Sequence, residues 1–412
     1  LDNRSRSEAK DIEKRFGEDV YEVTGQPTVV PTWPATKILW LRKREPNVFR
    51  SVWKFMMVED YIIYKLTGRA VTEPSVSSST LLLDIRRDRW WSEILEYLEL
   101  DEDKLPDIVQ SGSPVGELGE EASRELGLSQ GVLVASGAFD QAAAAIGAGN
   151  VEEGIVSEST GAALAIVATV SEPVYDPAGR IPLHRHAAPR LYFLMPWCQT
   201  AGIILKWFRD RFAQSEKIVG ELAGIDCYKL LDEEAERAPP GSDGIVILPH
   251  LAGAASPEFD PNARGVLFGL SLAHERGHVI RAMLESVGYM LRRNIELLEK
   301  LGIPIREVRS IGGGARSKIW CRIKSDILQL PVVLPVEEET ACLGVAILAG
   351  VASGIYGSLK DAAETVIQIR ERVEPNAENR AVYDELYGIY VELYERLREV
   401  FRKLAETGKG RG

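Results

Sequence analysis

The sequence predicts a protein of mixed α/β or α+β class with more than one domain. Helical and strand-like periodicities alternate along the whole chain, without a clear internal repeat or a low-complexity tract. At 412 residues the chain is longer than an ordinary single domain. A content of 45% hydrophobic and 27% charged residues is typical of a packed globular protein and excludes a disordered or fibrous one.

The net charge, the cysteines and the lengths of the apolar stretches exclude several kinds of partner and site. With 49 basic and 61 acidic residues the net charge is −12, which would repel a nucleic-acid backbone. The four cysteines form no CxxC pair, so neither a zinc site nor a disulfide framework is indicated. No stretch approaches the roughly 18 apolar residues that a membrane helix needs. We therefore expect a soluble cytoplasmic protein that binds neither nucleic acid nor membranes.

In the first part of the chain, the pattern predicts helices over residues 50–66 and 90–98 and a buried strand over 131–135. An alanine-rich helix over 141–146 follows, so Asp140 is expected at a strand-to-helix turn. A carboxylate beside a helix N-terminus stays ionised and could accept a proton from an alcohol or hold a metal through water. The alternatives are that Asp140 only caps the helix and that Gln141 only starts it, although Gln141 could also bind a polyol.

In the second part, residues 155–170 read as two strands around a glycine turn at 159–163. A strand over 308–311, a turn at 312–314 and a helix over 317–328 follow. The three glycines would let the backbone approach a ligand, with a tight structural turn as the alternative. They match neither a P-loop nor a Rossmann fingerprint.

Two long helices are expected near the C-terminus, over residues 276–301 and 376–408. The last one carries an apolar stripe of Val382, Leu386, Ile389, Leu393, Leu397, Val400 and Leu404. This stripe is expected to pack on the second lobe, and a contact with a second copy in a homodimer is an open alternative.

Two histidines, His184 and His186, could share one side of a strand and suggest a metal pair. A catalytic zinc usually needs three protein ligands, and no third ligand stands nearby in the sequence. We therefore expect solvent-facing or turn histidines and no metal-ligating residues.

Several strings in the sequence resemble the signatures of one enzyme family. Residues 34–41, Pro-Ala-Thr-Lys-Ile-Leu-Trp-Leu, are similar to its first signature, although Thr32 stands where a glycine, serine or aromatic residue is usual. Residues 265–270, Gly-Val-Leu-Phe-Gly-Leu, followed by 278–285, His-Val-Ile-Arg-Ala-Met-Leu-Glu, fit the second signature without departure. Over essentially its whole length the chain resembles the FGGY carbohydrate kinases, the group that includes xylulokinase and glycerol kinase.

This resemblance implies an actin-like, ribonuclease H-like α/β fold of two lobes, with ATP and sugar in the cleft between them. The N-terminal, substrate-side lobe would comprise residues 1–153, and the C-terminal, nucleotide-binding lobe residues 154–412. The implied activity is phosphorylation of a sugar or polyol hydroxyl with ATP and Mg²⁺, and a ketopentose such as xylulose is the first expectation for the acceptor.

The resemblance also implies roles for individual residues. Asp140 matches the family's catalytic base, and both Asp140 and Gln141 would bind the substrate. The residues that match nucleotide-binding positions of the family are Gly161, Gly202, Gly313, Gly314, Ala315 and Ser317.

Two departures from the family pattern bear on activity. Ala162 stands where the family has a threonine whose hydroxyl reaches the terminal phosphate, a loss of one hydrogen bond worth about 0.5–1.5 kcal/mol. The chain also starts inside the family's Trp-x-Asp-x-Arg segment, so we expect the first strands of the N-terminal lobe, with their phosphate-binding hairpin, to be absent. One alternative function is therefore a truncated, non-catalytic homologue that binds nucleotide as a regulatory subunit. A hydrolase on the same scaffold is another.

Overall fold

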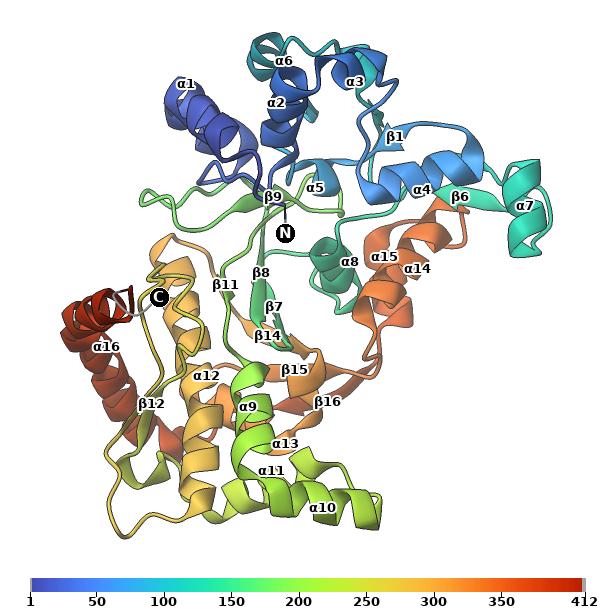
Figure 1. Cartoon of the computed structure of the whole chain (residues 1–412). Coiled ribbons are helices and arrows are strands. Elements are labelled where there is room, and N and C mark those ends of the chain that lie inside the picture. The colour runs from blue at the N-terminus through green and yellow to red at the C-terminus, as the bar shows by residue number, and fades with distance from the viewer. Residues whose placement is uncertain (1, 410–412) are drawn as a thin grey trace. The chain divides into compact units, whose positions relative to one another are not determined.

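The computed structural model describes residues 2–409, which form two compact units (Figure 1). Unit 1 comprises residues 1–153, 167–195 and 339–367, and unit 2 comprises 154–166, 196–338 and 368–412. Both units are therefore built from segments that are distant in sequence. The predicted division into ligand-binding lobes at residue 153 stays a prediction. Among the described residues, every helix is too short or too polar to span a lipid bilayer.

Unit 1 is mostly helical. Its helices are α1 (Arg6–Thr24), α2 (Pro34–Arg44), α3 (Pro46–Ser51), α4 (Val58–Thr67), α5 (Pro74–Ser77), α6 (Ser92–Leu98), α7 (Glu120–Leu126), α8 (Asp140–Gly147), α14 (Thr340–Ala352) and α15 (Leu359–Val366). Its short strands pair as β1 (Val71–Thr72) with β4 (Asp107–Ile108), β2 (Leu83–Asp84) with β3 (Arg89–Trp90), β5 (Pro114–Glu117) with β6 (Leu133–Ala135), and β9 (Leu183–Arg185) with β10 (Tyr192–Leu194).

Helices α8 and α14 of unit 1 pack at backbone distance. A Cβ built on Gly147 would lie 1.9 Å from the carbonyl oxygen of Thr340, and one built on Gly344 would lie 1.9 Å from that of Ala143. Only glycine leaves room for this approach, because real Cβ atoms do not come so close to an oxygen. The packing fixes α8, whose first residue is Asp140.

Unit 2 contains a sheet with the strand order β16 (Ile369–Val373), β15 (Val332–Pro335), β14 (Glu307–Ile311), β7 (Ile155–Thr160) and β8 (Leu164–Val170). Strands β15, β14 and β7 are parallel, and β16 is antiparallel to β15. The first residues of β8 pair with β11 (Trp197–Cys198), and β8 then continues into unit 1, where β10 pairs with it.

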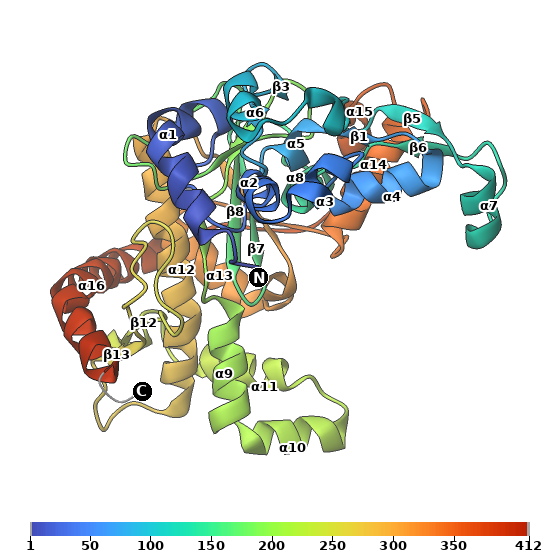
Figure 2. The same ribbon diagram turned by 45° about the horizontal axis from the view of Figure 1, so that its top comes forward.

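The helices of unit 2 are α9 (Gly202–Phe212), α10 (Gln214–Ala223), α11 (Cys227–Arg237), α12 (Arg276–Lys300), α13 (Lys318–Leu328) and α16 (Arg380–Lys409), and a separate hairpin pairs β12 (Val246–Leu248) with β13 (Val266–Phe268). Figure 2 shows that α9, α10 and α11 follow one another as a group. The predicted glycine turn separates β7 from β8, and the predicted strand, glycine turn and helix after residue 307 are β14, the loop Gly312–Gly314 and α13.

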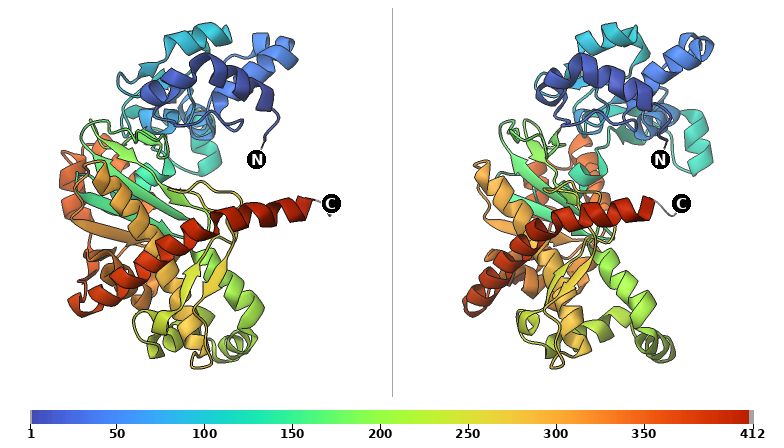
Figure 3. Two further views of the ribbon diagram at one scale, coloured as in Figure 1. Left: turned by 90° about the vertical axis from the view of Figure 1, so that its left-hand side faces the viewer. Right: turned by 60° about the vertical axis from the view of Figure 1, so that its left-hand side comes forward.

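Three predictions of local structure were wrong in whole or in part. The strand expected to be buried over 131–135 is β6, in which Val134 is buried but Leu133 is 39% exposed. The helix expected over 50–66 is divided into α3 and α4, with the side chain of Trp53 57% exposed between them. The buried face of α16, the long red helix in Figure 3, is made of Tyr383, Leu386, Tyr387, Tyr390, Tyr394 and Phe401. Of the predicted stripe, Leu386 is buried and Val382, Ile389, Leu393 and Leu397 are half-buried, whereas Val400 and Leu404 are exposed. Tyr289 of α12 contacts three of these tyrosine rings. The amphipathic tyrosines therefore replace part of the aliphatic stripe, since their rings bury apolar area while the hydroxyls find polar partners. The homodimer contact stays a prediction.

Candidate active site

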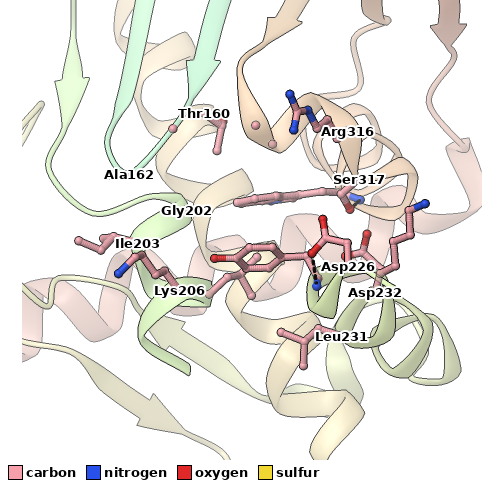
Figure 4. Close-up of a pocket in the computed structure, with 17 residues that line it drawn as sticks. Thr160, Ala162, Gly202, Ile203, Lys206, Asp226, Leu231, Asp232, Arg316 and Ser317 are labelled. Atoms are coloured by element: carbon pink, nitrogen blue, oxygen red, sulfur yellow. Dashed lines mark hydrogen bonds between the residues drawn. The ribbon is translucent and has the colours of Figure 1, made fainter. Parts of the chain in front are cut away.

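A pocket of about 430 Å³ lies within unit 2 (Figure 4). It is lined by three glycine-containing backbone segments, by α9 and α11, and by the start of α13. Five of the six predicted nucleotide-binding residues line it, namely Gly161, Gly202, Gly313, Gly314 and Ser317. The predicted residues thus meet in space although they lie up to 156 positions apart in sequence.

The turn between β7 and β8 is held against the start of α9. The amide of Gly202 donates to the carbonyl oxygen of Gly161 at 2.9 Å. The amides of Ala201 and Ile203 both donate to the carbonyl oxygen of Ala162, at 2.9 and 3.2 Å. Three hydrogen bonds therefore hold this turn in one wall of the pocket. The turn includes Ala162, which stands where the family has a threonine.

The glycine loop after β14 lies against the end of β7. Gly312 has a φ of +75°, and the loop continues as a short 3₁₀ turn over Gly313–Arg316. A Cβ on Gly314 would lie only 2.7 Å from the Cβ of Thr160, so the loop can approach Thr160 because it has no side chain there. The amide of Trp320 then donates to the Ser317 Oγ at 3.2 Å, which caps α13.

Ala315 does not line this pocket. Its side chain packs against a buried cluster of Cys321, Val332 and Leu334. Its carbonyl oxygen accepts a hydrogen bond of 3.0 Å from Arg370. Any contribution of Ala315 to nucleotide binding would therefore be through the shape of the loop, and its predicted role stays a prediction.

Helix α11 supplies pocket residues that sequence reasoning missed. Tyr228, Leu231 and Asp232 line the pocket, and the carboxylate of Asp226 accepts a hydrogen bond of 3.0 Å from the amide of Tyr228 (Figure 4, dashed line). Burial raises the pKa of Asp232 to about 6, and the Ser317 hydroxyl beside it opposes this shift. No motif marks α11, because an amphipathic helix in the sequence does not reveal which of its residues will line a pocket.

Basic and aromatic side chains complete the lining of the pocket. Lys206 of α9, Arg316 of the glycine loop and Lys229 of α11 are the basic residues of the lining. Lys206 also pairs with Asp210 at 3.3 Å, and Arg316 pairs with Glu338 at 2.6 Å. Trp320 adds an aromatic ring, and its indole N–H donates to the carbonyl oxygen of Leu284 at 3.0 Å. The pocket therefore combines backbone amides, cations and aromatic surface, a combination suited to a phosphorylated ligand that carries a flat ring.

Asp140 lies in unit 1 as the first residue of α8. Its side chain is exposed, and its Oδ1 accepts a hydrogen bond of 2.7 Å from the amide of Gln141, which is half-buried. The preceding residue is anchored, since the amide of Phe139 donates to the Ser75 Oγ at 2.9 Å and that hydroxyl donates to the buried carboxylate of Glu73 at 2.7 Å. Asp140 is thus an accessible carboxylate on a fixed turn.

Family models match both parts of the chain. The N-terminal domain of the FGGY family of carbohydrate kinases matches residues 1–147, and its C-terminal domain matches residues 159–353. The chain belongs to the FGGY family of carbohydrate kinases. The predicted resemblance and the prediction that the chain is a carbohydrate kinase are confirmed.

Individual FGGY relatives agree with this assignment. The chain is 30% identical over 399 residues to a xylulose kinase of Bacillus subtilis, covering 97% of this chain and 78% of that protein. It is 31% identical over 415 residues to a gluconokinase of the same organism, covering 99% of this chain and 80% of that protein.

Solved structures of FGGY kinases share the fold. A ligand-bound xylulose kinase from Lactobacillus acidophilus superposes with a TM-score of 0.85 at 27% identity, over 98% of this chain and 80% of that one. A gluconate kinase from the same organism superposes with a TM-score of 0.86 at 26% identity, over 98% and 80%. The predicted actin-like α/β fold is confirmed. FGGY sugar kinases use ATP as the phosphate donor.

The two histidines of this FGGY kinase are not solvent-facing, so that part of the prediction was wrong. His184, in β9, is 1% exposed, and His186, directly after β9, is 3% exposed. His186 begins the connection from β9 to β10, where its Nδ1 accepts a hydrogen bond of 2.8 Å from the amide of Ala188. His184 stacks between Phe139 and Phe193, and burial lowers the pKa of both imidazoles to about 4. His184 thus packs against Phe139, the residue before Asp140, and His186 packs edge-on against Phe193. Within residues 2–409 no group of three His, Cys, Asp or Glu side chains is arranged to hold a metal ion.

Proposed function

We propose that this FGGY kinase transfers the terminal phosphoryl group of ATP to a hydroxyl of a ketopentose such as xylulose, with Mg²⁺. The observation that carries the proposal is the pocket of unit 2, in which Gly161, Gly202, Gly313 and Gly314 come together. These are the positions at which the sequence matches nucleotide-binding residues of the family. The relatives of this chain support a ketopentose as the acceptor, because several of the similar proteins are xylulose kinases.

The proposed nucleotide site follows from the chemistry of the pocket lining. Backbone amides of the glycine loop at Gly313 and Gly314 can donate to phosphate oxygens. The amides at the start of α9 already donate to backbone carbonyl oxygens, so this helix would attract negative charge through its dipole. Lys206 and Arg316 would add Coulomb attraction to the phosphates. The apolar and aromatic surface of Leu231, Tyr228 and Trp320 suits the adenine base.

The proposed general base is Asp140. In phosphoryl transfer the charge spreads over the moving group, so the enzyme mainly positions the reactants and removes the acceptor's proton late. An exposed carboxylate at a fixed helix start can accept that proton, and the half-buried Gln141 beside it can hydrogen-bond a sugar hydroxyl. These roles rest on the match of both residues to the family pattern.

Mg²⁺ is proposed as a partner of ATP and not as a resident ion. The described residues contain no three-membered acidic or histidine cluster, whereas Mg²⁺ in kinases is usually held by substrate phosphates with one or two carboxylates and water. When bound, Mg²⁺ neutralises charge on the phosphates.

A coupled ADP-release assay with the 412-residue chain tests the proposal. Xylulose, ribulose, gluconate and glycerol are compared at equal concentration with ATP and Mg²⁺, and ATP binding is measured separately by calorimetry. Release with xylulose above all others supports the proposal. Release with gluconate alone would replace the acceptor, and release without any sugar would indicate a hydrolase. Binding of ATP without release on any sugar would favour a non-catalytic, nucleotide-binding subunit.

A further inference from the structure

A charged pair is fully buried beneath the pocket of unit 2. The Nζ of Lys324, on α13, lies 2.6 Å from the Oε1 of Glu158, on β7, and both side chains are 0% exposed. Lys324 also donates to the Oγ1 of Thr160 at 2.9 Å and to the Oγ of Ser310 at 3.4 Å. Thr160 and Ser310 in turn donate to Glu158, the former at 2.6 Å. We refer to Glu158, Thr160, Ser310 and Lys324 as the buried network.

Stability alone does not account for such a pair. Removing two ions from water costs several kcal/mol each, and the attraction between them repays that cost only where the geometry is good and further hydrogen bonds are made, as they are here. Replacing a buried ion pair with uncharged groups of similar size is often neutral or stabilising. The contacts of the pair are therefore a better guide to its role than the presence of two opposite charges.

Each member of the buried network belongs to a segment that carries part of the pocket. Thr160 lines the pocket itself and directly precedes Gly161. Ser310 lies in β14, two residues before Gly312. Lys324 lies on α13, and its Nζ is 5.1 Å from the ring centroid of Trp320, another lining residue. The network therefore joins the turn after β7, the glycine loop and α13.

Thr160 links the buried network to the glycine loop, because its hydroxyl belongs to the network and its other side-chain atoms contact the loop. The Oγ1 of Thr160 donates to Glu158 and accepts from Lys324, and these two hydrogen bonds fix the rotamer of Thr160. A Cβ on Gly314 would lie 2.7 Å from the Cβ of Thr160 and 2.8 Å from its Cγ2, so both atoms form the surface against which that loop packs. A different rotamer of Thr160 would leave its Cβ in place but exchange the methyl group at this contact for the hydroxyl or a hydrogen atom, which would change how the Gly314 backbone packs.

We propose that Lys324 and Glu158 are positioning residues for the nucleotide. They hold Thr160 and Trp320 so that the turn at Gly161 and the loop at Gly312–Gly314 stand at the separation that ATP requires. The inference rests on the proposed function, because it assumes that the pocket binds ATP.

The test compares two double variants of the full chain. Glu158→Gln with Lys324→Met removes both charges of the buried network at similar side-chain length. Arg281→Met with Glu285→Gln does the same to another buried ion pair of unit 2, whose atoms lie 2.9 Å apart on α12 and outside the pocket lining. The urea midpoint, the Kd for MgATP, and kcat and KM for the sugar and for ATP are measured for each.

We expect the network variant to keep a folded, cooperative unfolding transition while its Kd and KM for ATP rise by roughly tenfold, as loss of charge-assisted hydrogen bonds implies. Its KM for the sugar should stay unchanged. The control variant should bind ATP like the parent. Equal ATP affinity in the parent and the network variant, or equal loss in both double variants, would overturn the inference.

A milder variant covers the case in which the network variant does not fold. Ser310→Ala deletes one member that does not line the pocket, and it should weaken ATP binding by roughly threefold without loss of folding. An unchanged Kd for this variant would count against the inference. If the parent chain binds no ATP, the proposed function fails and the inference fails with it. If the parent binds ATP and the variants do so equally well, only the inference fails.

Discussion

The amide of Gly202 donates a hydrogen bond to the carbonyl oxygen of Gly161, and a Cβ built on Gly202 would lie 2.5 Å from that same oxygen. The first residue of α9 therefore touches the turn between β7 and β8 at a distance that only glycine allows. Both residues line the pocket of unit 2. The contact joins two loops that lie 41 positions apart in sequence and that are each proposed to face phosphate.

Gly202→Ala should displace the turn at Gly161. The added methyl group cannot be accommodated without a backbone shift, so we expect a loss of about 1–3 kcal/mol in the free energy of unfolding and clearly weaker ATP binding. Gly388→Ala is the matched control, because Gly388 is exposed on α16 with no atom within 4 Å of an added Cβ. It should stabilise the chain by about 0.5–1 kcal/mol. Urea unfolding and calorimetry measure both effects, and unaltered ATP binding by Gly202→Ala would contradict the proposed role of the contact.

Asp140→Asn should lower turnover by roughly 10²- to 10⁴-fold, the usual contribution of a positioned general base. The Asn side chain retains the oxygen that accepts from the Gln141 amide at 2.7 Å, so the start of α8 should not change. The Kd for ATP should stay the same, because Asp140 does not line the nucleotide pocket. Steady-state kinetics with xylulose and calorimetry with ATP separate the two effects. Loss of ATP binding with turnover intact would refute the assignment.

Ala162→Thr should strengthen ATP binding. It restores a hydroxyl at a pocket position where the family has threonine, and one added hydrogen bond is worth about 0.5–1.5 kcal/mol, or roughly 2- to 12-fold in Kd. Ala163→Thr is the control, since it places the same side chain one residue further along, outside the pocket lining. Equal effects of the two substitutions on the Kd for ATP would show that the position of the hydroxyl does not matter.

Asp232→Asn should change how stability depends on pH. Burial raises the pKa of Asp232 from 3.8 to about 6 in the folded chain, so the folded state holds this proton more tightly than the unfolded state does. The stabilising contribution is complete below pH 3.8 and is lost as the pH rises through about 6. Since the side chain is only partly buried, we expect the neutral variant to be more stable by about 1–2 kcal/mol at pH 7.5. The difference should shrink towards pH 4.5 in urea titrations, and parallel pH profiles of the two proteins would contradict this.

Much of the secondary structure was predictable because it depends on local patterns. The alanine-rich run predicted α8, which begins at Asp140, and the glycine triplet predicted a turn between β14 and α13. The predicted helix over 50–66 failed because its propensity did not reveal the break at residues 52–57, where Trp53 is exposed. The buried face of α16 was misjudged because tyrosines were not counted as apolar, although their rings pack on Tyr289.

The candidate site was predicted in part. Its glycines stand in motifs that can be recognised in the sequence, and five of the six predicted nucleotide-binding residues line one pocket. Tyr228 and Asp232 were missed because α11 carries no motif. The burial of His184 was missed because a histidine in a strand looks the same in the sequence whether it faces water or an aromatic ring.

The amino-acid sequence by itself determined the local features of this protein: the turns that need glycine, the acidic residue at the start of α8, and the signatures of the FGGY kinases. Only the tertiary structure decided which of these meet, and that Lys324 and Glu158, 166 residues apart, form a fully buried pair. The physical reason is that periodicity and propensity act over a few residues. The cost of burying a charge, in contrast, depends on the partner that packing brings to it, and a charged residue read alone is expected at the surface.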